Sequence, residues 1–126
     1  MNEATQRNVI LAVDDAPENL EIVRTLLAYR YTVTAAVNGP MALKIAERQR
    51  PDLILLDIQM PGMDGYEVCR RLKADPATSA IPVIFLTGES GVGSEVAEAG
   101  GSDYVTKPVD SDVLLSTVEK HLADRN

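Results

Sequence analysis

The sequence predicts an α/β fold in which a parallel β-sheet carries helices on both faces. Three short apolar runs, at residues 9–13, 53–56 and 81–86, show no in/out alternation, which is typical of strands covered on both faces. Strand-like and helix-like segments alternate five times along the chain, a pattern that favours parallel strands joined by helical crossovers. With 126 residues and no repeat, linker or low-complexity tract, the chain is expected to form one domain.

Composition limits the function classes. Apolar residues make up 45% and charged residues 25%, as in ordinary soluble globular proteins. The formal net charge of −7 argues against non-specific binding to nucleic acid or anionic membrane, and is compatible with binding a cation. The single cysteine, Cys69, excludes an intrachain disulfide and a cysteine metal cluster. No apolar run approaches transmembrane length, and residues 1–7 have no signal-peptide core, so a cytoplasmic location is expected.

The first half of the chain predicts two strands and two helices. The strand at residues 9–13 precedes a helix that opens at Pro17, a residue that fits the first helical position. The apolar stripe of this helix has five members, Leu20, Ile22, Val23, Leu26 and Leu27. Residues 32–37 alternate only in part and are expected to form an edge strand. A second helix starts at Gly39 and directs three apolar residues inward, Leu43, Ile45 and Ala46.

The second half predicts three more strands, at residues 53–57, 81–86 and 102–106. Asp64 and Glu67 stand three residues apart, the capping-box pattern that opens a third helix. Asp110 is expected to cap the last helix. The apolar line of that helix consists of Leu114, Val118 and Leu122.

Residues 88–101 differ from the rest of the chain because five of the eight glycines fall there. Each glycine inside a helix costs about 1 kcal/mol relative to alanine. Only residues 94–99 are therefore expected to be helical. This fourth helix is predicted to be short, weak and the most mobile element.

Polar side chains stand at the ends of the expected strands. If the strands run parallel, Asp14, Asp15, Asp57, Thr87 and Lys107 converge at one edge of the sheet. Three carboxylates repel one another unless a cation holds them, and Mg²⁺ is usual where carboxylates and phosphate share a site. One carboxylate can then act as a nucleophile toward phosphorus. Lys107 would supply a positive charge, and the Thr87 hydroxyl a hydrogen bond, to the equatorial phosphoryl oxygens.

The motif residues are Asp14-Asp15, Asp57 with Met60-Pro61 and Gly65, Thr87, and Lys107-Pro108. With them, the chain resembles the receiver domain of two-component response regulators over positions 9 to 122. The resemblance implies a doubly wound, five-stranded parallel sheet of strand order 2-1-3-4-5, a flavodoxin-like three-layer sandwich. Residues 1–7 would be a polar tail, and residues 8–124 would be the receiver domain.

The resemblance implies that Asp57 accepts a phosphoryl group from a histidine kinase or a histidine phosphotransfer protein. Mg²⁺ would be held by Asp14, Asp15, Asp57 and the backbone carbonyl of Gln59. Such a protein is a signalling phosphoacceptor that assists its own phosphorylation and dephosphorylation, rather than an enzyme. Its effector or output domain is unknown, and no cofactor besides Mg²⁺ and no direct contact with nucleic acid or membrane is implied.

Other roles also follow from the resemblance alone. Lys107 and Thr87 would bind the acyl phosphate, and Tyr104 would be the switch aromatic that moves inward as Thr87 turns to the phosphate. The peptide bond between Lys107 and Pro108 would be cis. Gln59 and Glu89 match variable positions that tune how long the phosphate lasts.

Two features depart from the family pattern. The interval between Thr87 and Lys107 is slightly shorter than is usual, and Gly88 stands where alanine is more usual. Both fall in the loop and helix that relay the signal to the surface formed by residues 88–125. Tyr104 can equally be a packing residue. Cys69 is expected to be a small buried apolar residue, and His121 a surface residue of the last helix, neither with an assigned function.

Four alternatives to the switch have sequence features for or against them. The glycine-rich fourth helix favours a binding module whose partners dock regardless of phosphate. Residues 88–94 fit the glycine spacing of a P-loop, but Ser94 and Glu95 stand where Lys and Ser/Thr are required. A flavodoxin-type flavin site is disfavoured because Asp14 and Asp15 would repel a phosphate without metal. A Mg²⁺-dependent phosphatase would usually carry its nucleophile on the first strand and add a cap for substrate.

Overall fold

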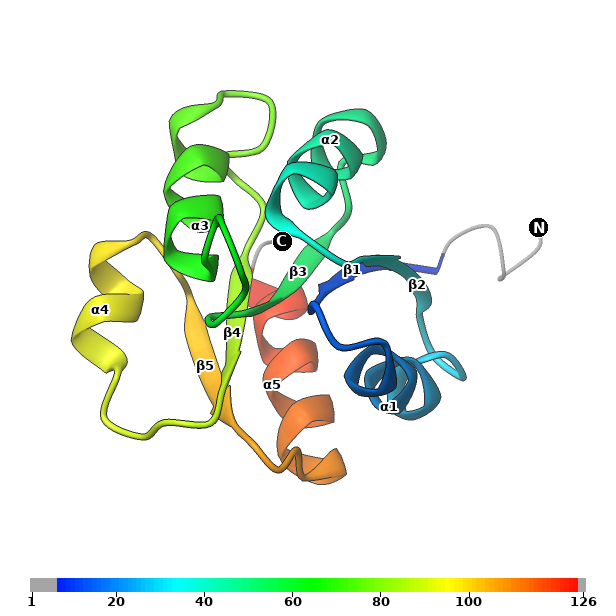
Figure 1. The fold of residues 1–126 in the computed structure, drawn as a ribbon. Coiled ribbons are helices and arrows are strands. Elements are labelled where there is room, and N and C mark those ends of the chain that lie inside the picture. The colour runs from blue at the N-terminus through cyan, green and yellow to red at the C-terminus, as the bar shows by residue number, and fades with distance from the viewer. Residues whose placement is uncertain (1–6, 125–126) are drawn as a thin grey trace.

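The computed structural model describes residues 7–124, with side chains as far as Ala123. Five strands alternate with five helices, and every strand pair in the sheet is parallel (Figure 1). The strand order is β2-β1-β3-β4-β5, so the predicted α/β class and the implied strand order are confirmed. Of the expected polar tail at residues 1–7, all but Arg7 lies outside the described residues. Within residues 7–124 no helix is long and apolar enough to cross a membrane.

The strands are β1 (Val9–Val13), β2 (Thr32–Ala36), β3 (Leu53–Asp57), β4 (Val83–Thr87) and β5 (Asp103–Thr106). Every residue of the inner strands β3 and β4 is buried, as their continuous apolar sequences predicted. The outer strands β2 and β5 are partly exposed. The prediction of an edge strand at residues 32–37 is confirmed.

The helices are α1 (Pro17–Leu27), α2 (Gly39–Gln49), α3 (Gly65–Ala74), α4 (Gly93–Glu98) and α5 (Ser111–Asp124). Asn38 and Asp64 each accept a hydrogen bond from a backbone N–H three residues on, at 2.8 and 2.9 Å, and so cap α2 and α3. Asp110 caps α5 in the same way. The capping box predicted at α3 is half formed, because the Glu67 carboxylate accepts from Arg71 instead.

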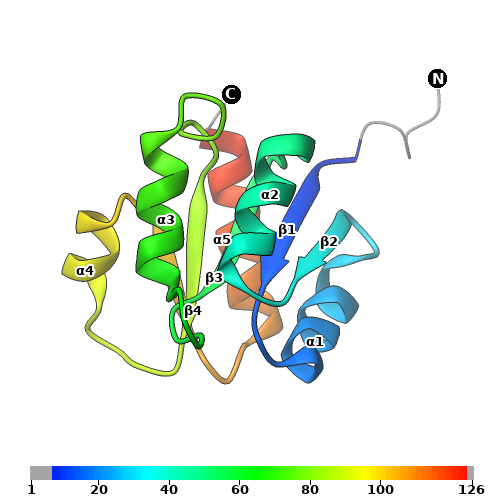
Figure 2. The ribbon, with the colours of Figure 1, turned by 45° about the horizontal axis from the view of Figure 1, so that its top comes forward.

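Two layers of apolar side chains hold the helices to the sheet. The helices lie on both faces of the sheet (Figure 2). Helices α1 and α5 cover one face and contribute five buried residues to it: Val23, Leu27, Leu114, Val118 and Leu122. Helices α2, α3 and α4 cover the other face and contribute six: Ala42, Ala46, Val68, Cys69, Leu72 and Val96. Ala99, the residue after α4, belongs to the same layer. Cys69 is buried, as predicted. Because helices cover both faces of the sheet, the ends of the strands remain accessible.

Two side-chain predictions were wrong. Ile22 is 52% exposed, because it lies on the solvent side of α1 rather than in its apolar stripe. His121 is not a free surface residue: its side chain is 13% exposed, and its Nε2 lies 3.0 Å from the carboxylate of Asp103. The cause is that α5 packs beside β5, so this position of the helix faces the edge strand.

Strand β4 begins at Val83 rather than at residue 81 and extends to Thr87. The residues before it belong to a turn, in which the Ile81 N–H donates to the Thr78 carbonyl at 3.1 Å. Pro82 has no N–H to pair with a neighbouring strand. Strand β5 likewise begins one residue later than predicted, at Asp103.

Helix α4 has six residues, which confirms that the glycine-rich segment forms a short fourth helix. Its N-cap position is Val92, which offers no side-chain hydrogen bond to the first turn. The predicted mobility of this helix stays a prediction.

Candidate functional site

The residues that were predicted to converge stand at the carboxyl edge of the sheet, the lower edge in Figure 2. Asp14 and Asp15 follow β1, and Asp57 is the last residue of β3. Thr87 ends β4, and Lys107 follows β5. The parallel register places these ends level with one another, because Asp57 pairs with Leu86 of β4 and Thr87 pairs with Thr106 of β5.

Three carboxylates form one cluster at this edge. One oxygen each of Asp14, Asp15 and Asp57 can be chosen such that the three lie within 4.8 Å of one another. Asp14 and Asp57 are buried and Asp15 is exposed, so the cluster opens to solvent on one side. An all-oxygen, anionic donor set with an open side fits a hard divalent cation such as Mg²⁺. The residues present therefore fit the metal that the sequence predicts.

Lys107 bridges two of these carboxylates. Its Nζ donates to Asp14 Oδ2 at 3.3 Å and to Asp57 Oδ1 at 3.2 Å. Burial lowers the pKa of Lys107, but the neighbouring carboxylates of Asp14 and Asp57 outweigh burial and raise that pKa above its ordinary value. The ammonium group is therefore held charged between the two acids.

Asp57 is only 7% exposed. Loss of hydration raises its pKa above the ordinary value, the Asp14 carboxylate raises it further, and Lys107 lowers it in part. The Asp57 carboxylate is thus poorly solvated and has a lysine as its one positively charged contact among the described residues. The Asp57 carboxylate would therefore be stabilised by any further cation that binds beside it.

Asp14 has two further hydrogen-bond donors that were not among the predicted site residues. The Ala16 backbone N–H donates to Oδ1 at 2.9 Å, and the Asn19 side-chain amide donates to Oδ2 at 3.2 Å. Asn19 lies in the first turn of α1, which starts at the carboxyl edge. An amide in the first turn after an acidic strand end is the signal that could have pointed to it.

Thr87 lies at the end of β4, and Tyr104 lies further from that edge, where it pairs with Phe85 of β4. The Thr87 side chain is buried, and its hydroxyl oxygen accepts a hydrogen bond from the Glu89 N–H at 3.0 Å. Tyr104 is half-buried on β5 and packs against the layer under α2, α3 and α4. A Cβ added at Gly93, the first residue of α4, would lie 3.9 Å from its ring. Tyr104 thus links β5 to α4, and its role as a switch stays a prediction.

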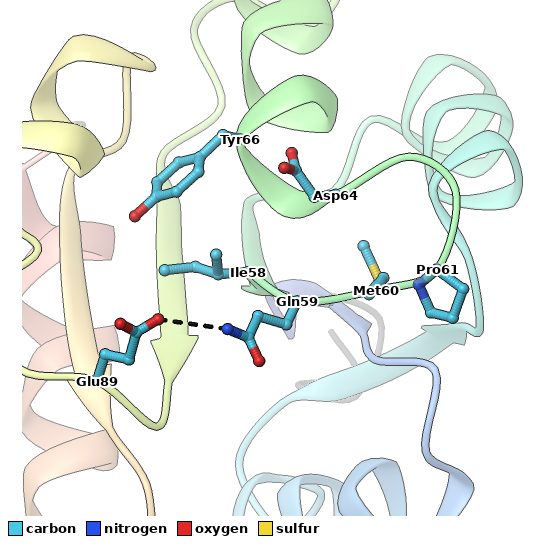
Figure 3. Close-up of a pocket in the computed structure, with 7 residues that line it drawn as sticks. All are labelled: Ile58, Gln59, Met60, Pro61, Asp64, Tyr66 and Glu89. Carbon is cyan, nitrogen blue, oxygen red and sulfur yellow. Dashed lines mark hydrogen bonds between the residues drawn. The ribbon is translucent and has the colours of Figure 1, made fainter.

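A recess of about 520 Å³ opens beside the cluster, between the loops that follow β3 and β4 (Figure 3). It is lined by Ile58, Gln59, Met60, Pro61, Asp64, Tyr66 and Glu89. The Gln59 side-chain amide donates to the Glu89 carboxylate at 3.3 Å across the recess. The structure therefore brings together the two positions that were expected to tune phosphate lifetime. The predicted role of the Gln59 backbone carbonyl stays a prediction.

The peptide bond between Lys107 and Pro108 is cis, as the resemblance implied. The Lys107 N–H also donates to the Thr87 carbonyl at 2.7 Å. The lysine is therefore tied to the end of β4 through its backbone and to the carboxylates through its side chain.

Comparisons with known proteins point to one family. The family model described as "Response regulator receiver domain" matches residues 10–119. Response regulator PleD of Caulobacter vibrioides is 47% identical over 112 residues, which are 86% of this chain and 25% of PleD. Protein PilH of Pseudomonas aeruginosa is 40% identical over 117 residues, which are 90% of this chain and 97% of PilH. The chain thus spans about a quarter of PleD and nearly all of PilH.

Solved structures agree with the sequence relatives. The receiver domain of the sensor histidine kinase PA1611 from Pseudomonas aeruginosa superposes with a TM-score of 0.86 at 32% identity. The match covers 93% of this chain and 98% of that one. That structure is described as having a magnesium ion coordinated in the active site cleft.

Proposed function

Because this chain belongs to the response regulator receiver domain family, and is a phosphoacceptor switch of the two-component type, we propose that Asp57 is its phosphoacceptor. The observation that carries the proposal is the position of Asp57: a buried carboxylate at the end of β3, beside Asp14 and bridged by Lys107. Its phosphodonor is a histidine kinase or a histidine phosphotransfer protein. The receiver domain extends over residues 8–124, and the protein acts in the cytoplasm.

In the proposed reaction an Asp57 carboxylate oxygen attacks the phosphorus of a phosphohistidine. The new O–P bond forms as the P–N bond breaks, and the donor imidazole leaves with the electron pair of that bond. Lys107 donates to the phosphoryl oxygens, and the Thr87 hydroxyl turns from the Glu89 N–H to the same group. Both side chains act as hydrogen-bond donors already placed where negative charge collects.

The carboxylates of Asp14, Asp15 and Asp57 would hold Mg²⁺. The backbone carbonyl of Gln59 would be a fourth ligand. When bound, Mg²⁺ neutralises the cluster and the phosphoryl oxygens and so removes the like-charge barrier to phosphoryl transfer. Asp14 is held for this role by the Ala16 N–H and by the Asn19 amide.

The phosphorylated site would change the surface formed by residues 88–125. Thr87 and Lys107 each lead directly into it, and the Lys107 N–H is bonded to the Thr87 carbonyl. Tyr104, which packs between β5 and α4, would follow the movement of Thr87. The alternative, in which partners dock whether or not the site is phosphorylated, assumes a vestigial site. It gains no support here, because all the side chains that would bind the phosphoryl group are present at the same edge of the sheet.

The proposal is tested by incubating the protein with acetyl phosphate and Mg²⁺ and measuring the intact mass. We expect a gain of one phosphoryl group in the parent protein and no gain in Asp57→Asn. Omission of Mg²⁺ should also abolish the gain. An equal gain in Asp57→Asn, or none in the parent, would refute the assignment of Asp57.

A further inference from the structure

The inference concerns the residues that orient Asp14, and it rests on the proposed function. Asp14 is 3% exposed, and its carboxylate has three described donors. The Ala16 N–H occupies Oδ1, while the Asn19 amide and the Lys107 ammonium group both donate to Oδ2. Oδ2 is thus shared between a neutral donor on α1 and a charged donor that follows β5.

The two donors to Asp14 Oδ2 differ in whether they stay hydrogen-bonded to it during the reaction. Lys107 must leave Asp14, at least in part, when it turns to the phosphoryl oxygens on Asp57. A buried carboxylate that loses a donor suffers a desolvation penalty, which is larger for a charged group than for a neutral one. The Asn19 amide keeps Oδ2 hydrogen-bonded after that movement, since α1 does not carry any of the phosphate-binding side chains.

The donor at position 19 is also uncharged, which suits a carboxylate that binds a metal. An amide donates a hydrogen bond without cancelling the negative charge of the carboxylate, so Asp14 remains attractive to a cation. A second ammonium group at this place would compete with the metal by Coulomb repulsion. Partners that hold a metal-binding carboxylate from behind typically account for about 10–100-fold in metal affinity.

We propose that Asn19 is a positioning residue, which holds the Asp14 carboxylate in its Mg²⁺-binding orientation while Lys107 moves to the phosphoryl group. Asn19 itself touches neither the phosphoryl group nor the metal. Asn19 also lines a recess of about 240 Å³ together with Asp14 and Lys107, so it faces two residues of the site rather than lying on a remote part of α1.

The simpler interpretation is that Asn19 only stabilises the first turn of α1. That turn lacks a side-chain cap, because its N-cap residue is Ala16. The two interpretations differ in what they predict for a variant that keeps the volume and favours the helix. Asn19→Leu removes the donor, is nearly isosteric, and has the higher helix propensity of the two residues.

The experiment measures Mg²⁺ binding without phosphorylation, as the rise of the melting temperature with Mg²⁺ concentration. We expect Asn19→Leu and Asn19→Ala to raise the half-maximal Mg²⁺ concentration by about tenfold. The melting temperature of Asn19→Leu in EDTA should be within error of the parent or higher. Two variants are used so that, if one fails to fold, Mg²⁺ binding can still be measured on the other.

Glu18→Gln is the matched control. Glu18 is exposed in the same turn and lines a separate recess on the outer side of α1. This variant removes a nearby charge but leaves the donors to Asp14 in place, so screening should limit its effect to less than about twofold. If it matched Asn19→Leu, general electrostatics of α1 would explain the effect and the inference would be wrong.

The phosphorylation rate with acetyl phosphate gives the second readout. For Asn19→Leu we expect a raised half-maximal Mg²⁺ concentration and a rate at saturating Mg²⁺ within about twofold of the parent. Unchanged Mg²⁺ midpoints in both Asn19 variants would overturn the inference while Asp57 phosphorylation stood. If Mg²⁺ stabilised the parent but acetyl phosphate did not phosphorylate it, the proposed function would be refuted. Raised Mg²⁺ midpoints in the two Asn19 variants would then support only the role of Asn19 in holding Asp14 for Mg²⁺ binding.

The Lys107→Met background tests whether Asn19 holds Asp14 independently of Lys107. With the ammonium group removed, Asn19 is the remaining side-chain donor to Asp14 among the described contacts. Asn19→Leu should then shift the Mg²⁺ midpoint at least as much as it does in the parent. Loss of the effect in this background would mean that Asn19 acts only through Lys107, contrary to the proposal.

Discussion

At the scale of single residues, Asp57 combines burial with charge. The residue is 7% exposed, and its carboxylate lies beside that of Asp14. Lys107 compensates both acids, yet loss of hydration and Coulomb repulsion still raise the pKa of Asp57. The native state therefore favours the protonated form of this group more than the unfolded chain does.

A raised pKa in the native state means that ionised Asp57 destabilises the fold when no cation is bound. The stabilising effect of its protonation is fully present below the unfolded pKa and is lost as pH rises through the native pKa. Asp57→Asn should thus raise the melting temperature by a few degrees in EDTA at about pH 7. The difference should shrink as the pH is lowered toward about 4. Thermal unfolding across this pH range measures both.

Asp15→Asn is the control for that measurement, because Asp15 belongs to the same cluster but is exposed. Its effect in EDTA should be clearly smaller at every pH. A lower melting temperature for Asp57→Asn than for the parent at neutral pH would contradict the argument from burial.

The sequence predicted which acids and which lysine lie at the site, but not how each is held. Asp14, Asp57 and Lys107 follow strand ends, so their positions depend only on the direction of the strands. Asn19 and His121 depend on the rotation of a helix about its axis, which apolar spacing defines only coarsely. Asn19 was therefore missed, and His121 was placed on the surface although it contacts Asp103.

At the scale of elements, the glycines around α4 fall into different classes. A Cβ at Gly88 would meet nothing within 4 Å, and its backbone has no positive φ. A Cβ at Gly101 would lie 2.7 Å from the Phe85 ring and 2.8 Å from the Val96 side chain. Gly101 is therefore required for close packing between β4, α4 and the start of β5, whereas Gly88 is not required by local sterics.

Gly88→Ala should stabilise the protein by about 0.5 kcal/mol, because alanine restricts the unfolded chain and fits the native backbone. Gly101→Ala should destabilise it by about 1–3 kcal/mol, because the Cβ must displace buried Phe85 and Val96. Chemical denaturation of the two variants and the parent gives both values. The explanation would be wrong if the two substitutions changed stability equally.

Element types could be predicted because strands and helices of this chain differ in length and apolar pattern. The ends could not be predicted equally well. Turn geometry at Ile81 and Pro82 delayed the start of β4, and the half-formed capping box at α3 shows Glu67 paired with Arg71 instead. Such choices depend on neighbours that are distant in sequence or on competition between equivalent partners.

At the scale of the whole molecule, the site is a product of parallel topology. Each strand delivers its last residue to the same edge, and the two apolar layers keep the strands level. This is why Asp14 and Lys107, 93 positions apart, share a hydrogen bond. Convergence of the motif residues could be predicted from the sequence once the strands were taken as parallel.

Mg²⁺ should stabilise the whole fold, because a ligand selective for the native state shifts the unfolding equilibrium by mass action. At about 100 times the dissociation constant the gain is about 2.7 kcal/mol, enough for a rise of several degrees in melting temperature. Asp14→Ala and Asp15→Ala should reduce this rise. The comparison is made on the increment caused by Mg²⁺, since Asp14→Ala also removes a partner of Lys107.

Glu21→Ala serves as the control for the Mg²⁺ increment, because Glu21 is an exposed carboxylate on α1 outside the cluster. Its increment should equal that of the parent. If Mg²⁺ did not change the melting temperature of the parent, the carboxylate cluster would not be a metal site.

The charges at the edge have a consequence for signalling logic. Among Asp14, Asp15, Asp57 and Lys107 the negative charges outnumber the positive ones. A phosphorylated donor is itself anionic, so without a bound cation these carboxylates would repel the phosphodonor that we propose for this site. Under the proposed function, the site would therefore work as a coincidence detector: it would respond only when a divalent cation and a phosphodonor are present together, and not to either one alone.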